Sequence, residues 1–134
     1  MAQHNELGRR GEELATAFLL SKGYGIIDRN WRSGHKEIDI VAQDGDDIVF
    51  VEIKTRSDET FNDARDAVDA HKRQLLIYAA EAYLRSHHYD LTPRFDIITV
   101  VGKYFDPDAS LTLDHIIDAY RAPVTPVRKF RSLR

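Results

Sequence analysis

Residues 37–54 read EIDIVAQDGDDIVFVEIK, and this stretch decides the fold. Charged or polar residues alternate with apolar ones on both sides of the turn signal Asp44-Gly45-Asp46, which predicts a β-hairpin of two antiparallel strands. Side chains alternate across a strand, so Glu52 and Lys54 are expected on one face, while the apolar residues beside them point to the other face, toward the core.

The register of this hairpin brings two carboxylates together. If residues 44–47 form the turn, position 43 pairs with position 48, and the same register places Asp39 opposite Glu52. It also pairs apolar residues along the buried face, namely Ile38 with Ile53, Ile40 with Val51, and Ala42 with Val49. The pattern of charges and the pattern of apolar residues therefore favour the same register.

Opposed carboxylates destabilise a sheet unless a cation offsets their repulsion. Mg²⁺, for which Mn²⁺ can substitute, prefers oxygen ligands and takes one or two carboxylates with waters and substrate phosphates. Asp39 and Glu52 are therefore the predicted metal ligands, and Lys54 is expected to orient or activate an attacking water. The pattern leaves a second interpretation open, in which these charges are the solvated face of an exposed hairpin.

The segments around the hairpin predict an α/β protein with the element order α-β-β-β-α-β. Apolar residues at helical spacing predict helices over residues 8–22 and 64–85. Strands are expected over residues 24–31 and 95–101, and residues 111–119 should form a last strand or a short helix. A mixed sheet flanked by helices is the predicted architecture.

Glu12 is the one acid of the first helix that borders the apolar stripe, whereas Glu13 points to solvent. It is therefore able to lean toward the sheet and join the metal site. The alternative role is that of an acid in the first turn of a helix, where the macrodipole alone stabilises it.

Length and composition bound the function. The chain has 134 residues, enough for one domain, with 43% hydrophobic and 31% charged residues, as in ordinary soluble globular proteins. It has no cysteine, which excludes disulfides, thiolate zinc sites and cysteine nucleophiles. No stretch approaches the ~20 apolar residues of a membrane span. We expect a soluble, cytoplasmic protein with no membrane partner.

The charge is unevenly distributed along the chain. The formal net charge is -3, yet five basic residues and no acidic residue lie between Arg121 and Arg134. We therefore divide the chain into a domain over residues 1–120 and a basic, extended tail over residues 121–134. The basic residues expected to contact nucleic acid are Arg56, Lys72, Arg128, Lys129 and Arg131. A solvated chain end and a solvated helix face are the alternatives.

Several motifs together resemble one protein family. They are GRRGEELA (8–15), GY (23–24), RNWR (29–32), EIDIVA (37–42), VEIKTRS (51–57), AV (67–68) and KRQ (72–74). This set closely resembles the YraN-like endonuclease family, a distant relative of archaeal Holliday-junction resolvases within the PD-(D/E)XK nuclease superfamily, and the resemblance covers roughly residues 7–101. Ile38 stands where the superfamily motif has proline.

The resemblance implies a fold, a site and an activity. The fold is a single-domain PD-(D/E)XK nuclease-like core, and the catalytic residues are Glu12, Asp39, Glu52, Lys54 and Gln74, with Glu12 a third metal ligand. The implied activity is Mg²⁺-dependent endonuclease hydrolysis of phosphodiester bonds in DNA, with branched DNA a candidate substrate and a homodimer a candidate assembly. Two alternatives remain: a non-catalytic nucleic-acid or protein-binding module on the same fold, and an RNA-directed nuclease.

Overall fold

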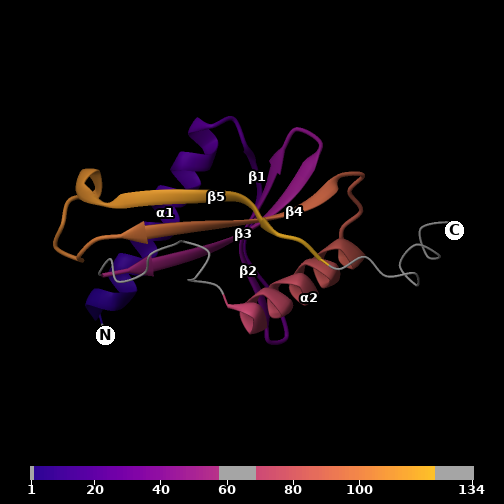
Figure 1. Cartoon of the computed structure of the whole chain (residues 1–134), viewed down its shortest axis with the longest axis horizontal. Helices are drawn as coiled ribbons and strands as arrows, with labels where there is room; N and C mark the ends of the chain where they lie inside the picture. The colour runs from indigo at the N-terminus through magenta and orange to yellow at the C-terminus, as the bar shows by residue number, and fades with distance from the viewer. Residues whose placement is uncertain (1, 58–68, 123–134) are drawn as a thin grey trace, which may run out of the picture.

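A five-stranded mixed sheet with the strand order β1-β2-β3-β4-β5 forms the centre of the molecule (Figure 1). The structure is a computed structural model and describes residues 2–57 and 69–122. The strands are β1 (Gly25–Ser33), β2 (Lys36–Asp44), β3 (Asp47–Arg56), β4 (Thr92–Val101) and β5 (Thr112–Tyr120). The helices are α1 (Ala2–Ser21), α2 (Ala70–Ser86) and the 3-10 turn η2 (Asp108–Ser110). The predicted α-β-β-β-α-β core is confirmed, and the last element is a strand.

Three of the four strand pairs are antiparallel, and only β3 and β4 run parallel within the described sheet. Parallel neighbours need a crossover connection, and α2 lies within the connection from β3 to β4. The parallel register sets Glu52 beside Ile97 and Lys54 beside Thr99. Glu52 and Lys54 therefore sit in the middle strand of the sheet, with a neighbouring strand on each side.

The predicted hairpin register is confirmed from the turn to the middle of the strands. Gln43 pairs with Ile48, and the pairing continues to Ile40 and Val51. The backbone ladder ends there, one pair before Asp39. The Asp39 carboxylate accepts a hydrogen bond from the backbone N–H of Ile53, with an Oδ2 to N distance of 2.8 Å.

The predicted pairing of Ile38 with Ile53 is wrong. Ile53 packs with Ile40 in the cluster beneath α1, whereas Ile38 packs in the cluster beneath α2. Beside this point on β1, Asn30 adopts the left-handed region with φ 53°. Asparagine tolerates that conformation, and β2 itself departs from a regular pleat here, because Ile38 and Ile40 are two residues apart yet pack on opposite faces.

Both faces of the sheet are covered. Ala15 and Leu19 of α1 pack on one face with the apolar residues at positions 40, 42, 49, 51, 53, 98 and 100. On the other face, Ile77 and Tyr83 of α2 pack with the apolar residues at positions 38, 41, 48, 50 and 95. A central strand buried on both sides needs a nearly continuous apolar run, and Ile48 to Val51 provides it. The interpretation of a solvated hairpin face is therefore wrong for Glu52, which is only 6% exposed.

Helix α2 begins at Ala70, not at the predicted residue 64. Asp69 is its N-cap and accepts a hydrogen bond from the backbone N–H of Lys72 at 2.9 Å. Capping by an aspartate satisfies an otherwise unpaired donor, so the helix starts where this cap lies rather than where the apolar periodicity starts. None of the helices in the described ranges is long and apolar enough to cross a membrane.

Helix α1 approaches the end of β3 closely. A Cβ atom at Gly11 would lie 2.3 Å from the Oγ1 atom of Thr55, so a larger residue at position 11 would push the helix away. This contact fixes the middle of α1 beside the carboxyl end of β3.

Candidate metal and catalytic site

Asp39 of β2 and Glu52 of β3 form a carboxyl pair, close enough for each group to shift the pKa of the other. The pair lies where the two strands cease to pair, so the carboxylate of Asp39 reaches the N–H of Ile53 that the ladder leaves available. The structure thus brings the two carboxyl groups together, as the hairpin register predicts.

Burial is the largest cause of the upward shift of both pKa values. Burial raises the pKa of Glu52 to about 8; the charge of Asp39 adds to that effect, whereas Lys72 and Lys54 oppose it. Burial also raises the pKa of Asp39 and the charge of Glu37 adds to that effect, whereas the hydrogen bond from the N–H of Ile53 and the charge of Lys72 oppose it.

Two lysines supply positive charge beside the pair. The ammonium nitrogen of Lys72 lies 3.7 Å from a carboxylate oxygen of Glu52, and the Lys72 side chain is 43% exposed. Lys54 follows two residues after Glu52 on β3 and is half-buried, close enough to lower the pKa of Glu52. The sequence predicted Lys72 as a phosphate contact, and the structure adds that it borders the carboxyl pair.

Glu12 does not contact the carboxyl pair in the described structure. It lies on α1, which packs on the face that carries Val51 and Ile53, whereas Glu52 points toward α2. Glu12 is half-buried, and its carbonyl oxygen accepts a hydrogen bond from the hydroxyl of Thr16 at 2.8 Å. Its role as a third metal ligand therefore stays a prediction.

The other predicted site residues are spread more widely. Gln74 is half-buried on α2, two residues beyond Lys72, on the helix that covers Glu52. Arg56 is half-buried at the end of β3, where it pairs with Val101. The tail residues Arg128, Lys129 and Arg131 lie outside the described residues.

The donor set of the pair suits a divalent cation with oxygen ligands. Two carboxyl groups from neighbouring strands can place their oxygens on one ion, and a cation there would offset the repulsion by Asp39 that helps to raise the pKa of Glu52. The described residues contain no group of three or more His, Cys, Asp or Glu side chains arranged to hold a metal. An ion at Asp39 and Glu52 would therefore complete its coordination with water or phosphate oxygens, as Mg²⁺ commonly does.

A second polar cluster lies on the α1 face and was not predicted. The guanidinium of Arg94 binds Asp96 at 2.9 Å, Asp44 at 2.8 Å and Asp47 at 3.1 Å, and it donates to the hydroxyl of Tyr24 at 2.7 Å. The signal that could have revealed this cluster is the pair Arg94 and Asp96, two charged residues near the start of the otherwise apolar strand β4.

Asp96, at the centre of this cluster, is fully buried. Burial opposes its ionisation, but the hydrogen bonds from His115, Arg94 and the N–H of Asp118 outweigh burial and hold the pKa of Asp96 below its usual range. Every acceptor here has a donor, so the cluster is a structural ion network that ties β4 to β5 and to the hairpin turn.

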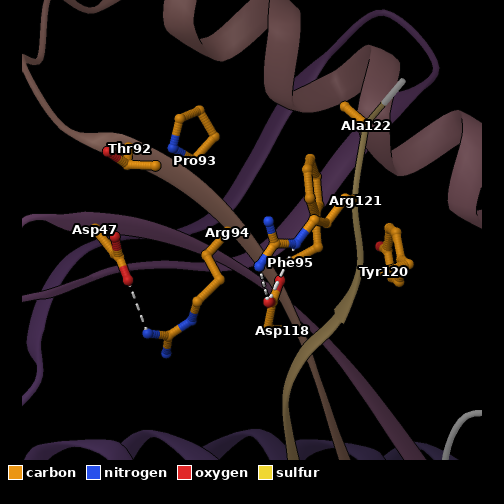
Figure 2. A pocket seen from close by; sticks show the side chains of 9 residues that line it. All are labelled: Asp47, Thr92, Pro93, Arg94, Phe95, Asp118, Tyr120, Arg121 and Ala122. Atoms are coloured by element: carbon orange, nitrogen blue, oxygen red, sulfur yellow. Dashed lines mark hydrogen bonds and ion pairs between the residues drawn. The ribbon is translucent and has the colours of Figure 1, made fainter. Parts of the chain in front are cut away.

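This network borders a pocket of about 300 Å³ at the opposite end of the sheet from Lys54 (Figure 2). Arg94 and Arg121 are the cations that line it. Figure 2 shows that both are already engaged by carboxylates, Arg94 by Asp47 and Arg121 by Asp118. The pocket therefore offers an anion little unsatisfied positive charge, and the carboxyl pair remains the better candidate site.

Comparison with known proteins assigns the family. The family model described as "Uncharacterised protein family UPF0102" matches residues 11–100. A "UPF0102 protein" of Phocaeicola vulgatus is 44% identical over 92% of this chain and 99% of its own length. Similar proteins of Bacteroides thetaiotaomicron and Flavobacterium psychrophilum are 45% and 42% identical, over 92% and 90% of this chain and 99% and 98% of their own lengths. The range that the family model matches contains Asp39, Glu52, Lys54 and Lys72. The chain belongs to the UPF0102 family.

Proposed function

We propose that this protein is a Mg²⁺-dependent endonuclease that hydrolyses phosphodiester bonds in DNA, with Asp39 and Glu52 as its metal ligands. One observation carries the proposal: the buried carboxyl of Glu52 and the half-buried carboxyl of Asp39 lie together beside two lysines, and burial with the charge of Asp39 raises the pKa of Glu52 to about 8. Perturbed acids at a convergence of charges are typical of functional sites.

The acid pair lowers the stability of the fold unless a cation offsets its charge. Burying an acid pair is unfavourable, and apolar residues of similar volume in the same place would pack at no electrostatic cost. A single salt bridge from Lys72 to Glu52 would account for one acid but leaves Asp39 without a cation of its own. A divalent ion accounts for both acids at once.

The chemistry follows from the positions of the charges. A bound Mg²⁺ would polarise the scissile phosphate and lower the pKa of a coordinated water. The Ile53 N–H holds the Asp39 carboxylate in place, and Glu52 must release its proton to become the second ligand. Lys54 supplies positive charge where the phosphate gains negative charge, and Lys72, exposed at its outer end, is able to contact a phosphate oxygen of the substrate.

The resemblance to resolvases is the reason for proposing DNA as the substrate. It is also the reason for proposing branched DNA as the preferred form and a homodimer as the assembly. The site itself would contact phosphate, which DNA and RNA share. Glu12 and Gln74 are proposed to assist, Glu12 as a further ligand and Gln74 from the helix above Glu52.

A cleavage screen tests the proposal. Single-stranded, duplex and branched DNA and RNA of matched sequence are incubated with full-length protein and Mg²⁺ or Mn²⁺. We expect metal-dependent cleavage of a DNA substrate that Glu52→Gln abolishes. Glu81→Gln, on the same helix as Lys72, is the matched control and should leave cleavage intact. If the wild type cleaves nothing yet binds these substrates, the protein is a binding module and the proposal is wrong.

A further inference from the structure

We propose that Tyr104 and Phe105 form a stacking platform for unpaired bases, so that the preferred substrate has a single-stranded segment next to the cleaved phosphodiester. The inference rests on the proposed nuclease function and names the substrate structure that it favours. It concerns the loop between β4 and β5, residues 102–111.

The two aromatic rings of this loop are unusually exposed. Phe105 is 68% exposed and Tyr104 is 43% exposed, and their rings meet edge to face with centroids 5.4 Å apart. Aromatic rings normally lie in the core, as Phe50 and Phe95 do here. Two adjoining rings in solvent present flat apolar surfaces with no partner among the described residues beyond each other.

Helix α1 holds this loop in a fixed conformation. The guanidinium of Arg10 donates to the carbonyl oxygen of Tyr104 at 2.7 Å, to that of Asp106, and to the carboxylate of Asp108 at 2.8 Å. The Arg10 side chain is only 15% exposed, although the Asp108 side chain that it binds is 59% exposed. One arginine thus fixes the loop at three points on both sides of Phe105.

The base of the loop is also fixed. A Cβ atom at Gly102 would lie 2.1 Å from the Cδ2 atom of Leu111, so the two ends of the loop approach more closely than a larger residue allows. The backbone N–H of Lys103 donates to the Asp106 carboxylate at 2.9 Å. A loop ordered before binding loses little conformational entropy when a base stacks on it, which favours affinity.

The loop lies at the same end of the sheet as the candidate site. Val101 pairs with Arg56, and the N–H of Gly102 donates to the carbonyl oxygen of Arg56, so the loop starts where β3 ends. Figure 1 shows it beside the N-terminal half of α1. Lys54 pairs with Thr99, and the five residues from Thr99 to Tyr104 can span at most about 18 Å. A single strand of a few nucleotides bridges that distance, within the usual footprint of a stacking groove.

The hollow and the charge beside this loop suit a nucleic-acid strand. A hollow of about 370 Å³ at this end of the sheet is lined by Ser57 and Lys103, among others. The carboxylates of Asp106 and Asp108 are engaged by a backbone N–H and by Arg10, which reduces their repulsion of a phosphate. Lys103 is exposed and takes part in none of the ion pairs among the described residues, so it is able to neutralise a phosphate.

Binding measured without metal tests this inference separately from catalysis. Full-length wild type, Phe105→Ala, Tyr104→Ala/Phe105→Ala and Phe105→Trp are titrated in EDTA against a labelled single strand, a blunt duplex and a duplex with a single-stranded overhang. Leu20→Ala, which removes another exposed apolar side chain, is the matched control. Thermal unfolding checks that each variant is folded.

We expect the wild type to bind the single strand and the overhang more tightly than the blunt duplex. Loss of Phe105 should weaken those two complexes about tenfold, loss of both rings further, and blunt-duplex binding should change little. Phe105→Trp should retain affinity, and single strands should quench its added fluorescence. Equal single-strand affinity of wild type and the double variant would overturn the inference, and so would a wild type that binds none of the three.

Cleavage gives the second readout. One outcome is that the wild type cleaves DNA and that the double variant has the same ratio of cleavage rates on overhang and blunt substrates. The stacking inference is then wrong, and the nuclease proposal stands. If stacking is found and no substrate is cleaved, the nuclease proposal is wrong and the platform belongs to a binding module.

Discussion

The ammonium nitrogen of Lys72 on α2 lies 3.7 Å from the buried carboxylate of Glu52 on β3. The two residues lie far apart in the sequence, on a strand and on a helix. The cap at Asp69 fixes the start of the helix, whose first turn carries Lys72 to Glu52. Lys72 only partly offsets the effect of burial, because the pKa of Glu52 still rises to about 8. The candidate site is therefore the hairpin together with the first turn of α2.

The raised pKa of Glu52 predicts that metal-free protein loses stability as pH rises. The ordinary pKa is 4.5 and the folded value is about 8, so the folded protein keeps a proton that the unfolded chain has released. The contribution of this proton to stability is complete below pH 4.5 and is lost as pH rises toward 8. Glu52→Gln, which mimics the protonated acid, should be the more stable protein at pH 8.5, by roughly 5 °C or more in Tm, and close to wild type at pH 4.5.

Thermal unfolding in EDTA between pH 4.5 and 9 measures this difference. Glu37→Gln, an exposed acid on the neighbouring strand, is the control and should follow the wild-type pH dependence. Parallel curves for wild type and Glu52→Gln would show that Glu52 ionises normally.

The hairpin was predictable because its signals are local. The turn at residues 44–47 and the alternation on either side fix the register, and the structure confirms the pairing of Gln43 with Ile48. That register alone sufficed to bring Asp39 and Glu52 to one site. The side on which Ile38 packs was not predictable, because residues two apart share a face in a regular strand, whereas Ile38 and Ile40 lie on opposite faces.

Long-range pairings were harder to predict. Arg94 binds Asp44 and Asp47 from fifty and forty-seven residues away, and no periodicity in the sequence connects them. The burial of Glu52 likewise depends on α2 covering a face that the alternation of charges assigns to solvent. Local patterns specify elements, whereas these contacts follow from how the elements pack.

Arg94→Met should destabilise the fold strongly without acting through the candidate site. It leaves the fully buried Asp96 without its guanidinium partner, and an uncompensated buried charge costs about 3–5 kcal/mol. Asp47→Asn removes a partially exposed partner of the same arginine and should cost less than about 1 kcal/mol.

Urea unfolding at pH 7 measures both changes, and Arg94→Met/Asp96→Asn should recover part of the loss, because it removes the unpaired charge. A cost for Arg94→Met no larger than that for Asp47→Asn would show that the network does not stabilise the fold.

Removing residues 123–134 should make nucleic-acid binding less dependent on salt. The removed segment contains four basic and no acidic residues, and each phosphate contact contributes about 0.7–0.9 to the slope of log affinity against log salt concentration. We expect the slope to fall by about 2–3, with metal-dependent stabilisation unchanged. A chain in which glutamines replace the four basic residues controls for length, and a slope equal to that of the wild type would show that the tail does not contact phosphate.

Lys54→Ala and Glu52→Ala should separate catalysis from metal binding. Glu52 is a proposed ligand, so its loss should abolish both cleavage and the rise in Tm that Mg²⁺ or Mn²⁺ gives the wild type. Lys54 is proposed to stabilise mainly the transition state, so its loss should spare the metal-induced rise in Tm and reduce turnover about 10²-fold or more. The double variant should cleave scarcely less than Glu52→Ala, because residues that serve one step are not additive. Cleavage by Lys54→Ala at the wild-type rate would exclude Lys54 from the chemistry, and a metal-induced rise in Tm retained by Glu52→Ala would place the ion elsewhere.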